Sequence, residues 1–135
     1  MILVDGGRAK QRQDLYRAAI FSWNYLMPRI SRCEIYIELT KLKAVHGYCL
    51  EINDREYEIE IDRRLKGDDF LTTVFHEMIH VRQGVRKEHP DMGYTKYNNH
   101  DEYLKQPWEV EAYELQEIML KEWNRRNMRC PRLIS

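Results

Sequence analysis

The run His76-Glu77-Met78-Ile79-His80 constrains the fold and chemistry of this chain more than any other feature. On an α-helix, residues four apart lie on the same face one turn apart, so both imidazoles can reach one metal ion. Glu77 would then lie beside that ion, where its carboxylate can take a proton from a metal-bound water. This spacing is typical of zinc hydrolases, most often peptidases, and it requires the run to be helical.

Hydrophobic periodicity predicts the elements around the motif. Helical spacing of apolar residues indicates a first helix over residues 8–27, which Pro28 ends. Alternating apolar and polar residues predict strands over 33–39, 46–52 and 55–62, and in the second of these the apolar set is Tyr48, Leu50 and Ile52. The last two strands form a hairpin around Asn53-Asp54, a turn that tolerates positive φ, with Tyr57, Ile59 and Ile61 facing inward. We expect the motif helix over about 70–85, capped at Asp68-Asp69, then an irregular stretch and a last helix over about 107–125.

These elements predict an α+β fold with a small, three-stranded, mostly antiparallel sheet. The N-terminal helix precedes the sheet, and the motif helix and a C-terminal helix that carries glutamates follow it. A chain of 135 residues is long enough for one domain with its own core. We therefore expect a single domain over residues 1–135, with its core at about 8–125 and a basic tail at 126–135.

The composition argues against several classes of protein. Lys and Arg number 22, as do Asp and Glu, so no net charge draws the chain to nucleic acid or to a membrane. Basic residues gather at both ends, which gives weak support for nucleic-acid contact. The three cysteines include no CxxC pair, which argues against a disulfide framework and against a cysteine-based zinc site. No apolar run is long enough for a membrane span or a signal peptide, so we expect a cytoplasmic protein without a membrane partner.

A third metal ligand must come from outside the motif, since catalytic zinc sites normally use three protein ligands and leave one position to water. An extended HExxHxxGxxH pattern would need glycine at 83 and histidine at 86, where this chain has Gln83 and Arg86. The candidates are Glu109 and Glu111 on the last helix and His100 before it. Glu109 and Glu111 lie about 200° apart around a helix, so at most one can point at the metal. The residues alone leave this choice open.

Two segments, 75–83 (FHEMIHVRQ) and 107–112 (PWEVEA), resemble small phage-encoded metallopeptidase-like proteins of the SprT-like type. They are also similar to the minimal gluzincins, whose domain is little more than a helix, a small sheet, the motif helix and a glutamate-bearing helix. The resemblance is specific over about residues 70–115 and only architectural before that. It implies a zincin-like fold and Zn²⁺ as the cofactor.

The resemblance also implies roles for individual residues. His76, His80 and Glu109 would correspond to the zinc ligands and Glu77 to the general base. In the gluzincin pattern a small residue follows the ligand glutamate three positions later, which Ala112 matches. The next position usually holds an Asp that hydrogen-bonds the first histidine, and here Tyr113 replaces it.

The function expected from these features is a zinc metallopeptidase that hydrolyses peptide bonds of a protein or peptide with a zinc-bound water activated by Glu77. The alternative is a catalytically silent zinc-containing module that binds protein or nucleic acid. The 46–62 hairpin is a plausible edge for an extended substrate. Its row of acidic residues, Glu56, Glu58 and Glu60, would favour basic substrates. His46 and His89 have no metal spacing and stay unassigned. Candidate oxyanion donors lie between the last two helices: Tyr94, Tyr97, His100 and Tyr103.

Overall fold

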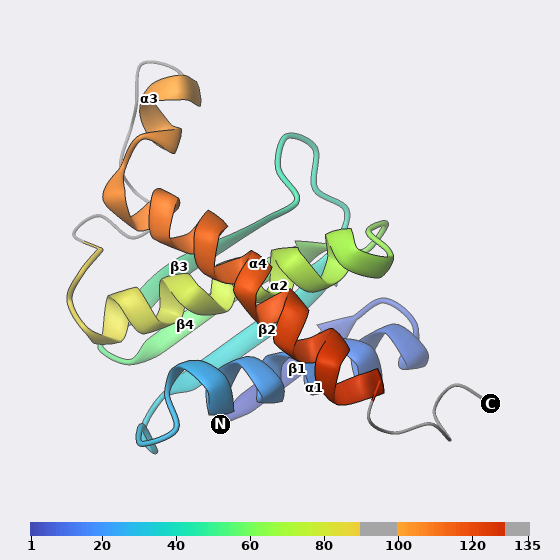
Figure 1. Ribbon diagram of the computed structural model, residues 1–135. Helices are drawn as coiled ribbons and strands as arrows, with labels where there is room; N and C mark the ends of the chain where they lie inside the picture. The colour runs from blue at the N-terminus through green and yellow to red at the C-terminus, as the bar shows by residue number, and fades with distance from the viewer. Residues whose placement is uncertain (90–99, 129–135) are drawn as a thin grey trace.

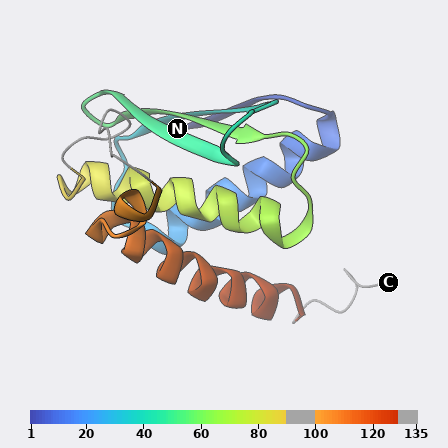
Figure 2. The ribbon, with the colours of Figure 1, turned by 90° about the horizontal axis from the view of Figure 1, so that it is seen from above.

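The computed structural model describes residues 1–89 and 100–128, which form an α+β fold as predicted. The elements in chain order are β1 (Ile2–Gly6), α1 (Ala9–Leu26), β2 (Glu34–Thr40), β3 (Gly47–Asn53), β4 (Glu56–Asp62), α2 (Gly67–Val85), α3 (His100–Leu104) and α4 (Pro107–Met128). The sheet forms one layer, α1 and α2 pack against one face of it, and α4 packs on the far side of α2 (Figures 1 and 2). None of the described helices is long and apolar enough to cross a membrane.

The sheet has four strands in the order β1-β2-β4-β3, so the predicted three-stranded, mostly antiparallel sheet is wrong. β1 pairs parallel with β2, β2 pairs parallel with β4, and only β3 and β4 are antiparallel. β1 was missed because five residues at the start of the chain show too little alternation to identify a strand. α1 then returns the chain so that β2 lies parallel to β1, as in a βαβ unit. Alternation identifies strands, but it does not say which strands pair.

The register of the sheet places the predicted apolar residues of β4 in the core. Tyr57, Ile59 and Ile61 lie opposite buried residues of β2 and are themselves buried, which confirms their inward orientation. On β3 the buried residue is Cys49, which lies opposite Ile59, whereas the predicted alternation used its neighbours. Because side chains alternate with a period of two, the apolar residues Tyr48, Leu50 and Ile52 belong to the other face.

Boundaries differ from the predictions by up to three residues. α2 begins at Gly67, so Asp68 and Asp69 lie in its first turn and not at the cap. Carboxylates are favourable there because the amino-terminal end of a helix carries partial positive charge. In the β3–β4 turn the positive φ falls on Arg55 and not on Asn53-Asp54. The stretch expected to be irregular contains the short helix α3, and α4 continues to Met128.

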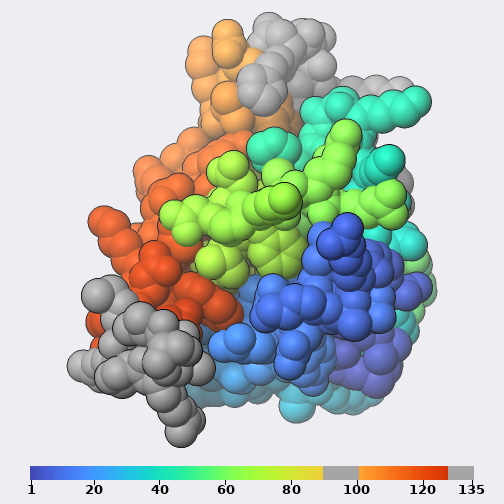
Figure 3. Space-filling view, turned by 90° about the vertical axis from the view of Figure 1, so that its right-hand side faces the viewer, coloured from blue at the N-terminus to red at the C-terminus, as the bar shows by residue number. Residues whose placement is uncertain are grey.

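The motif helix α2 lies at the centre of the molecule. It contacts α1, α4, β3 and β4, and Figure 3 shows its side chains between those of α1 and α4 at the end where α2 begins. Its residues from Thr73 to Val81 are buried without interruption. Phe75 packs against Phe21 and Trp123, with ring centroids 5.4 and 6.0 Å apart, and so joins three helices. The position of α2 therefore fixes where the motif side chains lie relative to β3 and α4.

Gly6→Ala is expected to lower the free energy of unfolding by more than about 2 kcal/mol. Gly6 has φ of 81° at the turn between β1 and α1, and an added Cβ would lie 2.2 Å from the Leu39 carbonyl oxygen. Gly67→Ala is a matched control, since φ is 58° there but nothing lies within 4 Å of the added Cβ. Urea denaturation of both variants measures the difference, and equal losses would contradict the steric account.

Candidate metal centre

Three residues from two helices bring their ligand atoms together at the interface of α2 and α4. His76 and His80 come from α2, and Glu109 comes from the first turn of α4. His76 Nε2 lies 3.1 Å and His80 Nε2 2.9 Å from the two Glu109 carboxylate oxygens, and the two Nε2 atoms lie 3.2 Å apart. All three side chains are buried, and their ligand atoms lie within 4.8 Å of one another. Such a group can hold a metal ion.

Glu111, another candidate for the third position, does not join this cluster. Glu111 points elsewhere: its carboxylate accepts a 2.8 Å hydrogen bond from Gln83 and lies 3.8 Å from Arg82. This agrees with the angular separation expected for residues two apart on a helix. His100 begins α3, but its side chain is outside the described part of the structure, as are Tyr94 and Tyr97.

Two glutamines form hydrogen bonds with the Nδ1 atoms of the histidines, which face away from the cluster. His76 Nδ1 lies 2.8 Å from Gln116 Oε1, and His80 Nδ1 lies 2.7 Å from Gln83 Oε1. The Gln83 amide nitrogen donates to the Trp108 carbonyl at 2.9 Å, so its oxygen must be the atom that faces His80. With oxygen acceptors at Nδ1, each imidazole carries its proton there. The Nε2 lone pairs then point at the centre of the cluster, which is the tautomer that binds a metal.

The cluster has the electrostatics of a cation site. Two Nε2 lone pairs and two carboxylate oxygens converge, and only a proton or a metal ion can relieve their repulsion. Burial lowers the pKa of His80, but the hydrogen bond to Glu109 and the charges of Glu77 and Glu109 outweigh it and raise that pKa to about 9. Burial likewise opposes ionisation of Glu109, yet its hydrogen bonds with the two histidines hold its pKa well below the usual range. A divalent ion fits this donor set.

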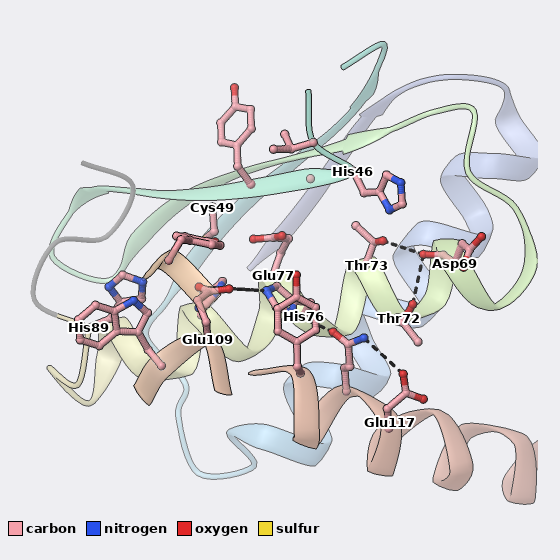
Figure 4. A pocket seen from close by; sticks show the side chains of 18 of the residues that line it. His46, Cys49, Asp69, Thr72, Thr73, His76, Glu77, His89, Glu109 and Glu117 are labelled. Atoms are coloured by element: carbon pink, nitrogen blue, oxygen red, sulfur yellow. Dashed lines mark hydrogen bonds and ion pairs between the residues drawn. The ribbon is translucent and has the colours of Figure 1, made fainter. Parts of the chain in front are cut away.

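A cavity of about 770 Å³ opens over the cluster and is bordered by α2, β3 and α4. Glu77 projects from α2 into this cavity beneath β3 (Figure 4). Its side chain is buried, and its carboxylate forms no hydrogen bond or ion pair with any residue in the described ranges. Burial is the largest effect on this group and raises the pKa of Glu77. A buried, unpartnered carboxylate next to a cation site is arranged to accept a proton from a ligand.

Further residues of the site escaped sequence reasoning. The ring of His89, which had no assignment, lies 5.3 Å from that of His80 and stacks on Trp108. Tyr113 packs on His76 with ring centroids 4.6 Å apart, and the hydrogen bond to the outer nitrogen of His76 comes from Gln116, three residues further along α4. Helical spacing could have identified both glutamines. Gln116 follows Glu109 by seven residues and Gln83 follows His80 by three, so each lies on the same helix face as a ligand.

Two other side chains in the cavity are held in their protonated forms. Cys49 lines the cavity, and burial raises the pKa of its thiol well above the ordinary value, which favours the protonated thiol. Burial and the nearby Glu109 raise the pKa of Tyr103, which hydrogen-bonds to Glu109. Tyr103 therefore keeps its phenol proton and remains a hydrogen-bond donor.

Gln116→Leu is expected to weaken metal binding by about 10–100-fold, the usual effect of losing an outer partner of a ligand histidine. The leucine leaves His76 Nδ1 without its 2.8 Å acceptor and frees the ring to turn. Gln116→Glu keeps an acceptor oxygen at this position and should retain affinity. Competition titration against a metal indicator measures both variants, and equal affinities for Leu and Glu would show that this contact does not orient His76.

Comparisons with protein-family models, with curated proteins and with solved structures find no match for the chain. Support for a function therefore comes from the site itself: the converging ligand atoms, the two glutamine partners and the unpartnered carboxylate in the cavity.

Proposed function

We propose that the chain is a zinc-dependent metallopeptidase of zincin-like architecture. His76, His80 and Glu109 hold Zn²⁺, and Glu77 acts as the general base. The observation that carries the proposal is the buried, unpartnered Glu77 carboxylate beside the His-His-Glu cluster, where both face an open cavity.

The donor set favours a catalytic zinc site over a structural one. Structural zinc sites are usually closed by four protein ligands, often cysteines, whereas catalytic sites use three and keep one position open. The metal-binding group identified among residues 1–89 and 100–128 has three members. Cys49, which also lines the cavity, is not one of them. Two imidazoles with one carboxylate are the ligands of zinc peptidases such as thermolysin.

The cavity residues supply the remaining chemistry. Bound zinc provides Lewis-acid activation of water and of a scissile carbonyl. Glu77 takes the proton of the attacking water and passes it to the leaving amine, and its raised pKa makes it a stronger base once ionised. Tyr113 also lines the cavity, and burial raises its pKa, so its phenol stays protonated. Tyr113 can therefore donate a hydrogen bond to an oxyanion, whereas Tyr103 already hydrogen-bonds to Glu109.

An extended peptide fits the geometry above the cluster. β3 is an edge strand of the sheet, and Gly47, Tyr48 and Cys49 on it line the cavity. An edge strand has unpaired backbone N–H and C=O groups, so a peptide can pair with β3 without a particular sequence. The scissile bond would then lie between β3 and α2, over Glu77. These features support a protein or peptide as the substrate.

The test is cleavage of a peptide library by metal-loaded protein. We expect cleavage with one equivalent of zinc, loss of cleavage after chelation, and recovery when zinc is restored. Mass spectrometry of the products measures all three states. Stoichiometric zinc without cleavage of any peptide would overturn the peptidase proposal and favour the catalytically silent binding module.

A further inference from the structure

Among the described residues, the cavity over the metal cluster is lined by acidic groups and by no basic ones other than histidines. Its charged lining residues within the described ranges are Asp69, Glu77, Glu109 and Glu117, and no Lys or Arg lies among them. A bound divalent ion would neutralise only two of these four negative charges. Since the whole chain has no net charge, this is a local excess that attracts cations to the cavity.

Asp69 and Glu117 lie away from the metal cluster, toward one end of the cavity. Asp69 precedes Glu77 by eight residues on α2, and Glu117 follows Glu109 by eight residues on α4, which is about 12 Å along each helix. The two helices run in opposite directions, so both offsets lead the same way (Figure 1). The close view places both carboxylates at the end of the cavity opposite His89 (Figure 4).

Neither carboxylate is neutralised by a residue in the described part of the chain. The Asp69 carboxylate has no hydrogen bond or ion pair within residues 1–89 and 100–128, and that of Glu117 accepts one long bond of 3.5 Å from the Gln116 amide. By contrast, Glu122 on the same helix pairs with both Arg125 and Arg126. Asp69 and Glu117 are therefore available to a cation from outside the chain.

The opposite face of the sheet beside the cavity is also acidic. Tyr48 lines the cavity from β3 and donates a hydrogen bond to Glu60 on the face of the sheet that no described helix covers. Burial, this bond and the charges of Glu60, Glu58 and Glu38 raise the pKa of Tyr48 to about 12. None of these three glutamates lines the cavity itself.

We propose that Asp69 and Glu117 form a subsite that selects a lysine or arginine side chain two or three residues from the scissile bond. An extended peptide advances about 3.3 Å per residue, so three residues and a long basic side chain span the distance from Glu77. The inference rests on the proposed peptidase function. The unpartnered, buried Glu77 marks where the reacting bond lies in the same cavity.

The first experiment is a positional-scanning library cleaved by zinc-loaded protein. We expect lysine and arginine to be enriched about tenfold over glutamine at a position two or three residues from the cut. Asp69→Asn combined with Glu117→Gln should lower the ratio of kcat/KM for a lysine peptide to that for its glutamine counterpart by about tenfold. Asp68→Asn and Glu114→Gln are matched controls, since neither residue lines the cavity, and they should leave the ratio unchanged.

A binding assay separates the subsite from the chemistry. Glu77→Gln loaded with zinc should bind a fluorescent lysine peptide more tightly than its glutamine counterpart, and the Asp69 and Glu117 substitutions should remove the difference. Cleavage without a basic preference, or a preference that survives both substitutions, would overturn the subsite and leave the peptidase standing. Lysine-selective binding without any cleavage would support the subsite and overturn the peptidase. Neither cleavage nor selective binding would overturn both.

Discussion

Replacing Glu77 with glutamine is expected to lower kcat for peptide cleavage by about 10²–10⁴-fold while zinc stays bound. Glutamine has the size of the native side chain but cannot accept a proton from water. The three ligand residues are unchanged, so the cluster keeps its geometry. Steady-state kinetics together with metal analysis of the same preparation measure the two effects. Glu114→Gln, an exposed substitution on α4 outside the cavity, is the control and should retain full activity.

The stability of Glu77→Gln distinguishes lost chemistry from lost structure. Because burial raises the pKa of Glu77 above its unfolded value, the ionised carboxylate destabilises the metal-free protein as the pH rises through that unfolded pKa. A neutral glutamine removes this effect, so the metal-free variant should unfold at or above the temperature of the wild type at pH 7. Activity within tenfold of the wild type would exclude Glu77 as the general base, and a lower Tm would contradict the account of its burial.

Glu109→Ala is expected to weaken zinc binding by more than about 100-fold, beyond the range seen when only an outer partner is lost. The substitution removes both carboxylate oxygens that lie 2.9 and 3.1 Å from the histidine nitrogens. Glu111→Ala should keep most of its affinity, since Glu111 contacts Gln83 and not the cluster. Calorimetric titration of zinc into the metal-free variants measures both affinities.

Thermal unfolding gives an independent measure of the same difference. Zinc at 100 times its Kd stabilises a protein by about 2.7 kcal/mol, so the wild type and Glu111→Ala should show a zinc-dependent rise in Tm. Glu109→Ala should show little rise at the same zinc concentration. The opposite pattern, with zinc lost from Glu111→Ala and kept by Glu109→Ala, would show that the third ligand is wrongly assigned.

The local spacing of residues in the sequence predicted the structure correctly in most cases where a property depends on residues close together in the chain. The four-residue spacing of His76 and His80 places both on one face of α2 in any helix, and the alternation of Tyr57, Ile59 and Ile61 placed them inward. Pro107 marked the start of α4 correctly because proline lacks the N–H that a first helical turn leaves unused. On β3 the same reasoning chose the wrong face, since Cys49 faces the core and its more apolar neighbours do not.

The α+β class, the motif helix and the placement of His76 and His80 on one face of it could be predicted from the sequence, because helical and strand periods are local properties of the backbone. Only the tertiary structure decided that β1 joins the sheet, that β2 and β4 pair in parallel, and that Glu109 and not Glu111 reaches the histidines. The packing of α4 against α2 makes that choice and brings Gln116 to His76. These pairings join residues 22 or more positions apart in the chain. The burial of a shared core sets their geometry, and no local period of the sequence encodes it.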